Sequence, residues 1–216
     1  MTSPPWRMVT VDIDGSLTTV HGWLVLARQF GREQGYQDLM RRFRSGQVDE
    51  LGAITGLLEL AEGRTLAEVH AALARTPKLA NIPEGVARLH AEGLRVALLT
   101  HNPPYVTAWY RRFAGFDDAD GLFGRQSVGI LIGPPEGIRP DKLAGLAALC
   151  RRQGVWPTEV VHVGDGGADA AVFPHVGEGI ALNARRPEVD RAADRVLHTH
   201  DFQDVVDAVL GAGVGR

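Results

Sequence analysis

A short apolar run, Met8 to Val11, leads directly into two aspartates, Asp12 and Asp14, and a glycine, Gly15. The run is compact and β-branched, which predicts a buried strand, and Gly15 allows a sharp turn where a β-carbon would interfere. In open α/β sheets, ligands bind just outside the carboxyl ends of the strands. Two carboxylates at that place repel each other unless a cation or a proton intervenes. The pattern therefore favours a hard divalent cation, most commonly Mg²⁺, at the end of this strand.

Three other interpretations of this stretch are available. Asp and Gly are ordinary turn residues, so Asp12 to Gly15 also fits a plain junction between a strand and a turn. A calcium loop of the EF-hand type requires Gly at its sixth position and Glu at its twelfth, and those positions hold Leu17 and Trp23, which excludes it. A solvated acidic pair on the surface agrees poorly with the apolar strand that precedes it.

Composition limits the class of protein. A chain of 216 residues, 44% hydrophobic and 23% charged, is long enough for one buried core or for a core with a small added domain. The net charge is −3, and no basic cluster is dense enough to indicate a nucleic-acid partner. The single cysteine, Cys150, excludes an intramolecular disulfide framework. Because neither a signal peptide nor a long apolar span is visible, we expect a soluble, cytoplasmic protein with no membrane partner.

Residues 19–82 carry helical patterns and no strand pattern. Apolar residues recur at helical spacing in four segments, and Thr65 with Glu68 predicts a capping box at the start of the last one. The segments are 20–35, 37–44, 48–61 and 65–73. We therefore predict a small helical domain over residues 19–82, inserted into a core domain that residues 1–18 and 83–216 form together.

From residue 83 onward, helical and strand patterns alternate, which is typical of a parallel sheet with right-handed crossovers. Further strands are predicted at 94–100, 159–163, 179–182 and 196–197, and a glycine-rich, β-rich segment at 127–138 is compatible with a hairpin. Helices are predicted at 84–92, 105–113, 141–154, 187–193 and 202–210. The expected fold class is α/β, with a Rossmann-like parallel sheet flanked by helices.

Several side chains suited to phosphate chemistry stand at the ends of these predicted elements. Those that follow or end a strand are Asp12, Asp14, Thr100, Asp165 and Asp169. Lys142 begins a helix, where backbone amides also favour an anion. Together they supply acids for Mg²⁺, a hydroxyl and an ammonium for phosphoryl oxygens, and a carboxylate able to attack phosphorus.

Each of these residues also has an ordinary structural interpretation when it is taken alone. Thr100 could cap the turn that follows it, and Lys142 could be a solvated lysine at a helix start. Residues 164–169 could form an ordinary loop. Gly164 and Gly166 are only part of a dinucleotide-binding fingerprint, because Asp169 replaces its last glycine. The phosphate interpretation depends on the combination and its order along the chain.

With these motifs in place, the sequence resembles the haloacid dehalogenase-like superfamily, in its phosphatase branch, and is most similar to the phosphoserine-phosphatase type. Residues 12–18 resemble the first family motif, 98–100 the second, Lys142 the third and 163–169 the fourth. The separation of Lys142 from the fourth motif is also similar. The resemblance covers residues 8 to about 210, and it implies that the helical insert is a cap domain.

The resemblance implies a role for each motif residue. Asp12 is expected to be the nucleophile that forms an aspartyl-phosphate, and Asp14 the general acid and base. The phosphate-binding residues implied are Thr100, His101 and Lys142, with Arg139 as a rival to Lys142. The metal ligands implied are Asp12, the backbone carbonyl of Asp14, and Asp165, supported by Asp169. The function implied is Mg²⁺-dependent hydrolysis of a small phosphomonoester. A phosphotransferase or mutase is the alternative, and a non-catalytic phosphate-binding module is disfavoured because every motif residue is present.

The sequence departs from the phosphoserine type where that type binds its substrate. His21 stands where a glutamate meets the substrate amine, and residues 55–57 lack the arginine that binds the substrate carboxylate. Residues 101–104 replace a glycine pair, and Ala168 replaces an asparagine. Because both charged contacts are missing, we expect an enzyme that is not specific for phosphoserine. His21 and Trp23 are the residues most expected to shape its specificity.

Overall fold

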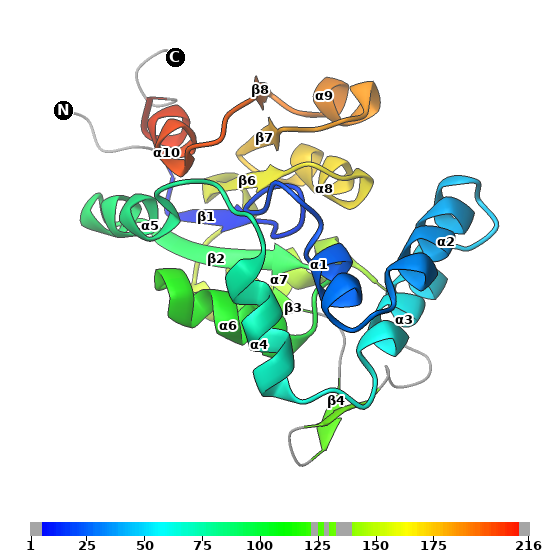
Figure 1. Cartoon of the computed structure of the whole chain (residues 1–216). Coiled ribbons are helices and arrows are strands. Elements are labelled where there is room, and N and C mark those ends of the chain that lie inside the picture. Colours follow the sequence, from blue (N-terminus) through cyan, green and yellow to red (C-terminus); the bar gives the residue numbers. More distant parts are fainter. Residues whose placement is uncertain (1–5, 122–124, 128–129, 133–139, 212–216) are drawn as a thin grey trace.

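The computed structural model describes residues 6–121, 125–127, 130–132 and 140–211 (Figure 1). Its centre is a six-stranded sheet in which every neighbouring pair is parallel. The strands, in order across the sheet, are β3 (Asp118–Gly121), β2 (Arg95–Thr100), β1 (Met8–Val11), β6 (Val160–Gly164), β7 (Glu178–Leu182) and β8 (Arg195–Leu197). The predicted α/β class with a parallel sheet is confirmed.

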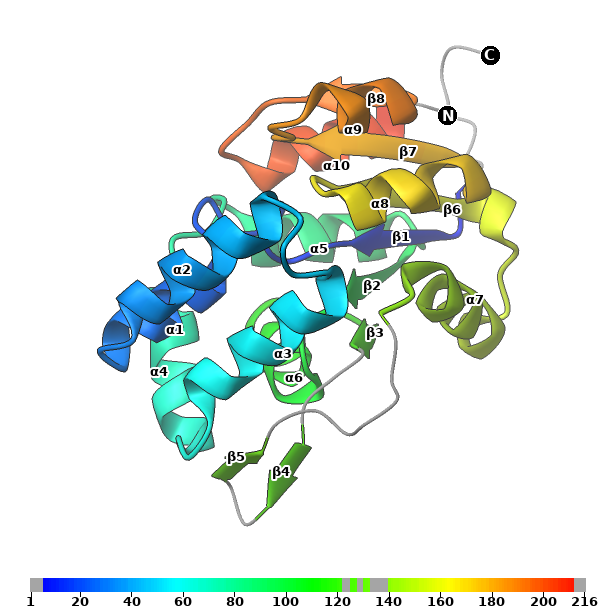
Figure 2. The ribbon, with the colours of Figure 1, turned by 90° about the vertical axis from the view of Figure 1, so that its right-hand side faces the viewer.

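Side chains of the central strands alternate between two buried faces. Val9 and Val11 of β1 pack into the larger hydrophobic cluster, whereas Met8 packs into a second cluster on the other face. The larger cluster is covered by α5 (Ile82–Ala91), α6 (Pro104–Ala114) and α10 (Phe202–Gly211). The opposite face is covered by α7 (Lys142–Gln153), α8 (Gly167–Val172) and α9 (Pro187–Ala192), with short 3₁₀ turns at Pro157–Glu159 and Phe173–His175 (Figure 2). Burial on both faces explains why these strands read as continuous apolar runs.

The edge strand β3 was not predicted. Its sequence, Asp-Ala-Asp-Gly, lacks the apolar and β-branched residues that identify strands. It pairs with β2 through the backbone, with Ala97 opposite Asp118. The side chains of Asp118 and Asp120 accept from Arg152 of α7 at 2.9 and 3.3 Å. Charged residues are ordinary on an edge strand, because they discourage pairing with a further strand.

A separate two-stranded antiparallel sheet joins β4 (Arg125–Ser127) to β5 (Ile130–Ile132). It overlaps the first part of the hairpin predicted at 127–138. Residues 133–139, which include Arg139, lie outside the described residues.

Four helices occupy the insert between β1 and α5, at the carboxyl ends of the strands (Figures 1 and 2). They are α1 (Gly22–Gln29), α2 (Glu33–Arg44), α3 (Glu50–Ala61) and α4 (Leu66–Arg75). Leu26 of α1 and Ala72 of α4 belong to the same buried cluster as Val11 of β1. The predicted capping box is confirmed, since Thr65 N–H donates to Glu68 Oε2 at 2.8 Å and Glu68 N–H to Thr65 Oγ1 at 3.3 Å.

The chain enters and leaves this insert through two segments that lie side by side. Thr19 N–H donates to the carbonyl of Pro77 at 3.1 Å, and Leu79 N–H donates to the carbonyl of Leu17 at 3.0 Å. Thr18 lies between them, in an antiparallel bridge to Lys78. Residues 17–19 and 77–79 therefore form one paired crossing between the sheet and the insert.

The helices are short. Helices α2, α3 and α7 have 12 residues each. Over the ranges that the structure covers, no helix combines the length and the apolar character needed to cross a membrane.

Candidate active site

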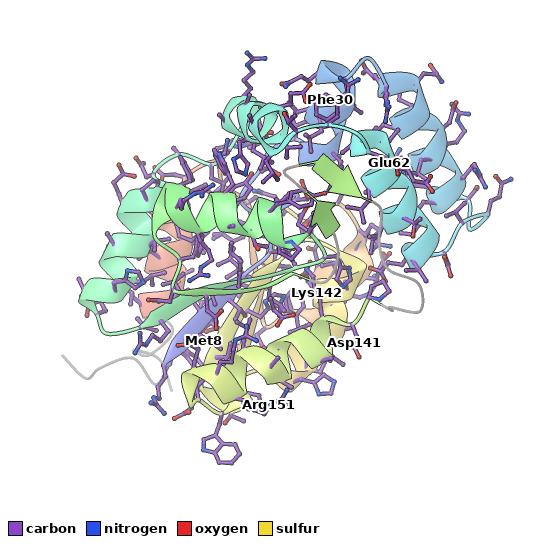
Figure 3. The ribbon with its side chains drawn as sticks, turned by 90° about the horizontal axis from the view of Figure 1, so that it is seen from below. Met8, Phe30, Glu62, Asp141, Lys142 and Arg151 are labelled. Atoms are coloured by element: carbon purple, nitrogen blue, oxygen red, sulfur yellow. The ribbon has the colours of Figure 1, made fainter. Side chains whose placement is uncertain are left out.

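The carboxyl ends of β1, β2 and β6 meet the start of α7 at the floor of a cavity of about 500 Å³. The register places Val11 of β1 beside both Leu98 of β2 and Val163 of β6, so the residues that follow these strands emerge at one edge. Lys142 lies at the end of α7 that faces the insert, and Arg151 lies toward the other end (Figure 3). The residues gathered at this cavity floor are Asp12, Thr100, Lys142, Asp165 and Asp169.

Lys142 is the positive charge at the centre of this floor. Its Nζ lies 2.9 Å from Asp12 Oδ1 and 2.5 Å from Asp169 Oδ1, and only 6% of the residue is exposed. Burial alone would lower the pKa of Lys142, but the two carboxylates outweigh burial and raise it well above its usual value. Lys142 therefore stays charged. An ammonium group has three N–H donors, so a further donor can meet a phosphoryl oxygen.

Asp169 is held in place by three protein groups. Besides Lys142, His162 Nε2 lies 2.9 Å from Asp169 Oδ1, and Gly166 N–H donates to Oδ2 at 2.9 Å. Burial alone would raise the pKa of Asp169, but Lys142 and the hydrogen bond from His162 outweigh burial and hold that pKa below its usual value. Asp169 is thus an ionised carboxylate that accepts hydrogen bonds, one of them donated by Nε2 of His162.

His162 was not singled out from the sequence. It is fully buried in β6, and its Nδ1 lies 3.0 Å from the hydroxyl of Thr10 on β1. One signal could have indicated it, namely a polar residue in the middle of a buried valine-rich strand, because such a residue needs a partner.

The acidic centre, formed by Asp12, Asp165 and Asp169, fits a divalent cation. One carboxylate oxygen from each of the three lies within 4.8 Å of the others. Burial, with the charges of Asp12 and Asp169, outweighs the opposing effect of Lys142 and raises the pKa of Asp165 to about 8. Clustered carboxylate oxygens are the donors that hard divalent cations prefer.

Gly15 is required by the packing of this centre. Its φ is +90°, and a β-carbon placed there would lie 2.2 Å from Asp165 Oδ2. Any side chain would therefore displace an acid of the centre, as well as adopt a strained backbone conformation.

The Asp14 side chain is fixed from two sides. Its Oδ1 accepts from the backbone N–H of Gly22, the first residue of α1, at 2.5 Å, and its Oδ2 accepts from Asn102 Nδ2 at 2.9 Å. Asn102 also accepts from Trp23 Nε1 at 2.9 Å and donates to Thr100 Oγ1 at 3.1 Å. Asn102 was missed by the sequence analysis. It joins the insert, the second strand and the Asp14 carboxylate in one network.

The two residues predicted to shape specificity, His21 and Trp23, both line the cavity. The predicted phosphate ligand His101 also lines it, and its ring is directed to the insert, with Nδ1 3.0 Å from Glu50 Oε1 of α3. The hydrogen bond from His101 lowers the pKa of Glu50. Phosphate binding by the His101 side chain stays a prediction.

Arg186 is a further cavity residue that the sequence analysis did not identify. Its guanidinium lies against Gly167 at the start of α8, where a β-carbon would come within 2.6 Å of Nη2. Nothing in its local sequence distinguishes it from other surface arginines.

Comparison with known families shows the family of the chain. The family model described as haloacid dehalogenase-like hydrolase matches residues 6–177. The chain belongs to the haloacid dehalogenase-like hydrolase family. The match includes β1, the helical insert and β6, and so covers all the residues of the cavity floor.

The chain is also similar to individual proteins and to solved structures. The chain is 26% identical over 182 residues to a phosphoserine phosphatase of Archaeoglobus fulgidus, covering 83% of this chain and 53% of that protein. It is 28% identical over 212 residues to a phosphoserine phosphatase of Streptomyces coelicolor, covering 95% of this chain and 50% of that protein. The chain thus spans about half the length of these two relatives. A crystal structure of a haloacid dehalogenase family hydrolase from Salmonella enterica serovar Typhi has the same fold, with a TM-score of 0.86, 19% identity, and coverage of 96% of this chain and 72% of that one.

Proposed function

We propose that this protein is an Mg²⁺-dependent phosphatase that hydrolyses a small phosphomonoester through an aspartyl-phosphate on Asp12. The observation that carries the proposal is the position of the Asp12 carboxylate, which lies on the cavity floor beside the Lys142 ammonium and within the acidic centre. Membership of a hydrolase family and similarity to phosphoserine phosphatases support it.

Four residues have roles in the reaction: Asp12, Asp14, Thr100 and Lys142. An Asp12 carboxylate oxygen attacks phosphorus, so that a bond from Asp12 to phosphorus forms as the bond to the alcohol oxygen breaks. Asp14 gives a proton to that leaving oxygen and then takes one from the water that attacks the aspartyl-phosphate. Inorganic phosphate leaves and Asp12 is regenerated. Lys142 and Thr100 hold the phosphoryl oxygens in both steps.

Asp12, Asp165 and the backbone carbonyl of Asp14 are the groups that would hold Mg²⁺, with Asp169 supporting them. The bound cation supplies positive charge that allows a phosphoryl group to approach several carboxylates. Its contribution adds to that of Lys142, whose single charge faces the acids of the centre.

We further propose that residues 19–82 act as a cap over the site. An aspartyl-phosphate must meet one water at the right moment and otherwise stay dry. Gly22 and Trp23 of α1 take part in holding the Asp14 network, which couples the position of the cap to the general acid. The cap lacks the charged pair expected for phosphoserine, so specificity for that substrate is not part of the proposal.

Hydrolysis of p-nitrophenyl phosphate with and without Mg²⁺ tests the proposal. We expect nitrophenol and inorganic phosphate in equal amounts with Mg²⁺, and loss of activity in a chelator. Equal release separates hydrolysis from transfer to a second alcohol. Asp14→Asn, which cannot activate water, should accumulate protein heavier by one phosphoryl group. Activity that persists unchanged in the chelator would contradict the proposal.

A further inference from the structure

The side of the cavity that faces the acidic centre is formed by one face of α3. The lining residues of this helix recur at the spacing of a single helical face. They are Glu50, Ala53, Ile54, Leu57 and Leu58. Apart from Glu50, at the first turn, every residue on this face is apolar. A face with this pattern ordinarily packs into a core, whereas here it also borders an open cavity.

The outer helix α2 adds two more apolar residues, Met40 and Phe43, which are one turn apart. Phe43 is 41% exposed, although it is a large aromatic residue. Together the six apolar residues form what we call the apolar wall: Met40, Phe43, Ala53, Ile54, Leu57 and Leu58. An exposed aromatic residue at the border of a cavity is typical of a binding site for an apolar group.

Two further charged residues that line the cavity, Glu50 and Arg186, have partners. Glu50 lies 3.0 Å from His101 Nδ1. Arg186 lies on the core side against Gly167, with Nη1 3.6 Å from Glu188. The apolar wall itself offers no ionisable group. A carboxylate or an ammonium placed against it would lose its hydration without a compensating charge, which is strongly unfavourable.

We infer that the substrates of this enzyme are phosphomonoesters of uncharged, largely apolar alcohols, whose ring or branched chain packs against the apolar wall. This inference rests on the proposed function, because it places the phosphoryl group on Asp12 and Lys142 and directs the alcohol toward α2 and α3. It goes beyond the loss of phosphoserine specificity, since it names the chemistry that replaces the charged contacts.

Binding of two non-hydrolysable phosphonates to the Mg²⁺-loaded protein tests the preference directly. Benzylphosphonate has an apolar ring, and 2-amino-4-phosphonobutyrate has the carboxylate and ammonium of phosphoserine. Isothermal titration should give a dissociation constant at least about tenfold lower for benzylphosphonate than for the amino acid analogue. Apolar contact with the wall favours the benzyl ring, whereas desolvation disfavours the carboxylate and the ammonium. Equal affinities, or tighter binding of the amino acid analogue, would overturn the inference.

Two matched variants locate the preference. Ile54→Ala shortens a side chain of the apolar wall, and Leu60→Ala shortens a partly buried side chain of the same helix that does not line the cavity. Ile54→Ala should weaken benzylphosphonate binding by about fourfold or more, the factor that corresponds to about 0.8 kcal/mol for one buried methylene. Leu60→Ala should change it less than about twofold, with both melting temperatures recorded. The same effect in both variants would overturn the assignment to the wall.

Turnover then separates this inference from the proposed function. Benzyl phosphate, whose leaving group is an aliphatic alcohol as in phosphoserine, should have a higher kcat/KM than phosphoserine. If benzylphosphonate binds preferentially but no phosphomonoester is hydrolysed, the proposed function is wrong and the preference of the cavity stands. If phosphoserine is hydrolysed more efficiently than benzyl phosphate, the phosphatase proposal is supported and the inference about its substrates is overturned.

Discussion

The cavity floor and the apolar wall face each other across one cavity, and they are built differently. The floor joins strand ends to a helix start, and its charges lie within hydrogen-bonding distance of one another, as Lys142 does with Asp12 and Asp169. The wall consists of helix faces without charge and leaves Phe43 partly exposed. The floor depends on where individual atoms lie, whereas the wall depends on shape and apolar area. Changes to the floor should therefore abolish function, and changes to the wall should adjust it.

The largest effect is expected for Asp12→Asn, because an amide cannot act as the nucleophile. We expect kcat for p-nitrophenyl phosphate to fall by at least about 10³-fold. The melting temperature in chelator should not fall, because the substitution removes one of three crowded carboxyl groups. Phosphate release and thermal denaturation measure the two effects. Asp118→Asn, on the edge strand, is the control and should keep its turnover within about twofold.

Lys142→Met should cause the next largest effect, on stability. Removing the buried ammonium leaves Asp12 and Asp169 without their shared counter-charge, at a cost of about 3–5 kcal/mol in the free energy of unfolding. Urea denaturation in chelator measures this loss. The control is Arg28→Met, because Arg28 pairs with Glu33 at 2.8 Å on the exposed surface, and it should cost less than about 1 kcal/mol. Equal losses in the two variants would show that the buried ion pairs of Lys142 contribute no more to stability than an exposed ion pair.

Trp23→Phe should have a moderate effect on rate. The substitution keeps an aromatic ring but removes the N–H that Asn102 accepts, so the network that holds Asp14 loosens. One lost hydrogen bond is worth about 1 kcal/mol, which corresponds to a decrease in kcat of about fivefold. Trp109→Phe on α6, which lies outside the cavity, is the matched control. A decrease in both variants would indicate a general loss of stability instead of a positioning role.

The smallest effect is expected for Glu50→Gln, at the border between wall and floor. His101 lowers the pKa of Glu50 from 4.5 in the folded protein, so the carboxylate stabilises the fold at a pH above 4.5 and loses this contribution as the pH falls through the lowered value. Since Glu50 is half-exposed, the difference at neutral pH should be below about 1 kcal/mol. Urea denaturation of both proteins at neutral pH and at about pH 4 should show the difference shrinking. A difference that grows in acid would exclude this contact as its source.

The sequence predicted the fold best where burial is two-sided. The central strands β1, β2 and β6 carry continuous apolar runs, because both of their faces are covered, and such runs are readable from composition alone. The edge strand β3 was not predicted, because it is held by backbone pairing with β2 and by Arg152. Arg152 belongs to α7, which is distant from β3 in sequence. No local pattern contains that partner.

The candidate site divides in the same way. The motif residues Asp12, Lys142 and Asp165 could be identified because they follow or begin elements that the sequence reveals. Asn102 could not be identified, since it matters through a contact with Trp23, which is distant in sequence. His162 carried one signal, its polarity within a buried strand, but its partner Thr10 is also distant in sequence. The apolar wall was visible only as a helix with an apolar face. That this face borders a cavity depends on how the insert is placed.

The paired crossing at residues 17–19 and 77–79 makes the insert a replaceable part. Both connections pass through one short antiparallel pairing, so the chain leaves the core and returns to it at nearly the same point. A short loop could therefore join residues 17–19 to 77–79 in place of the four helices. Evolution could therefore exchange the insert while the strand ends that hold Asp12 and Asp165 kept their geometry.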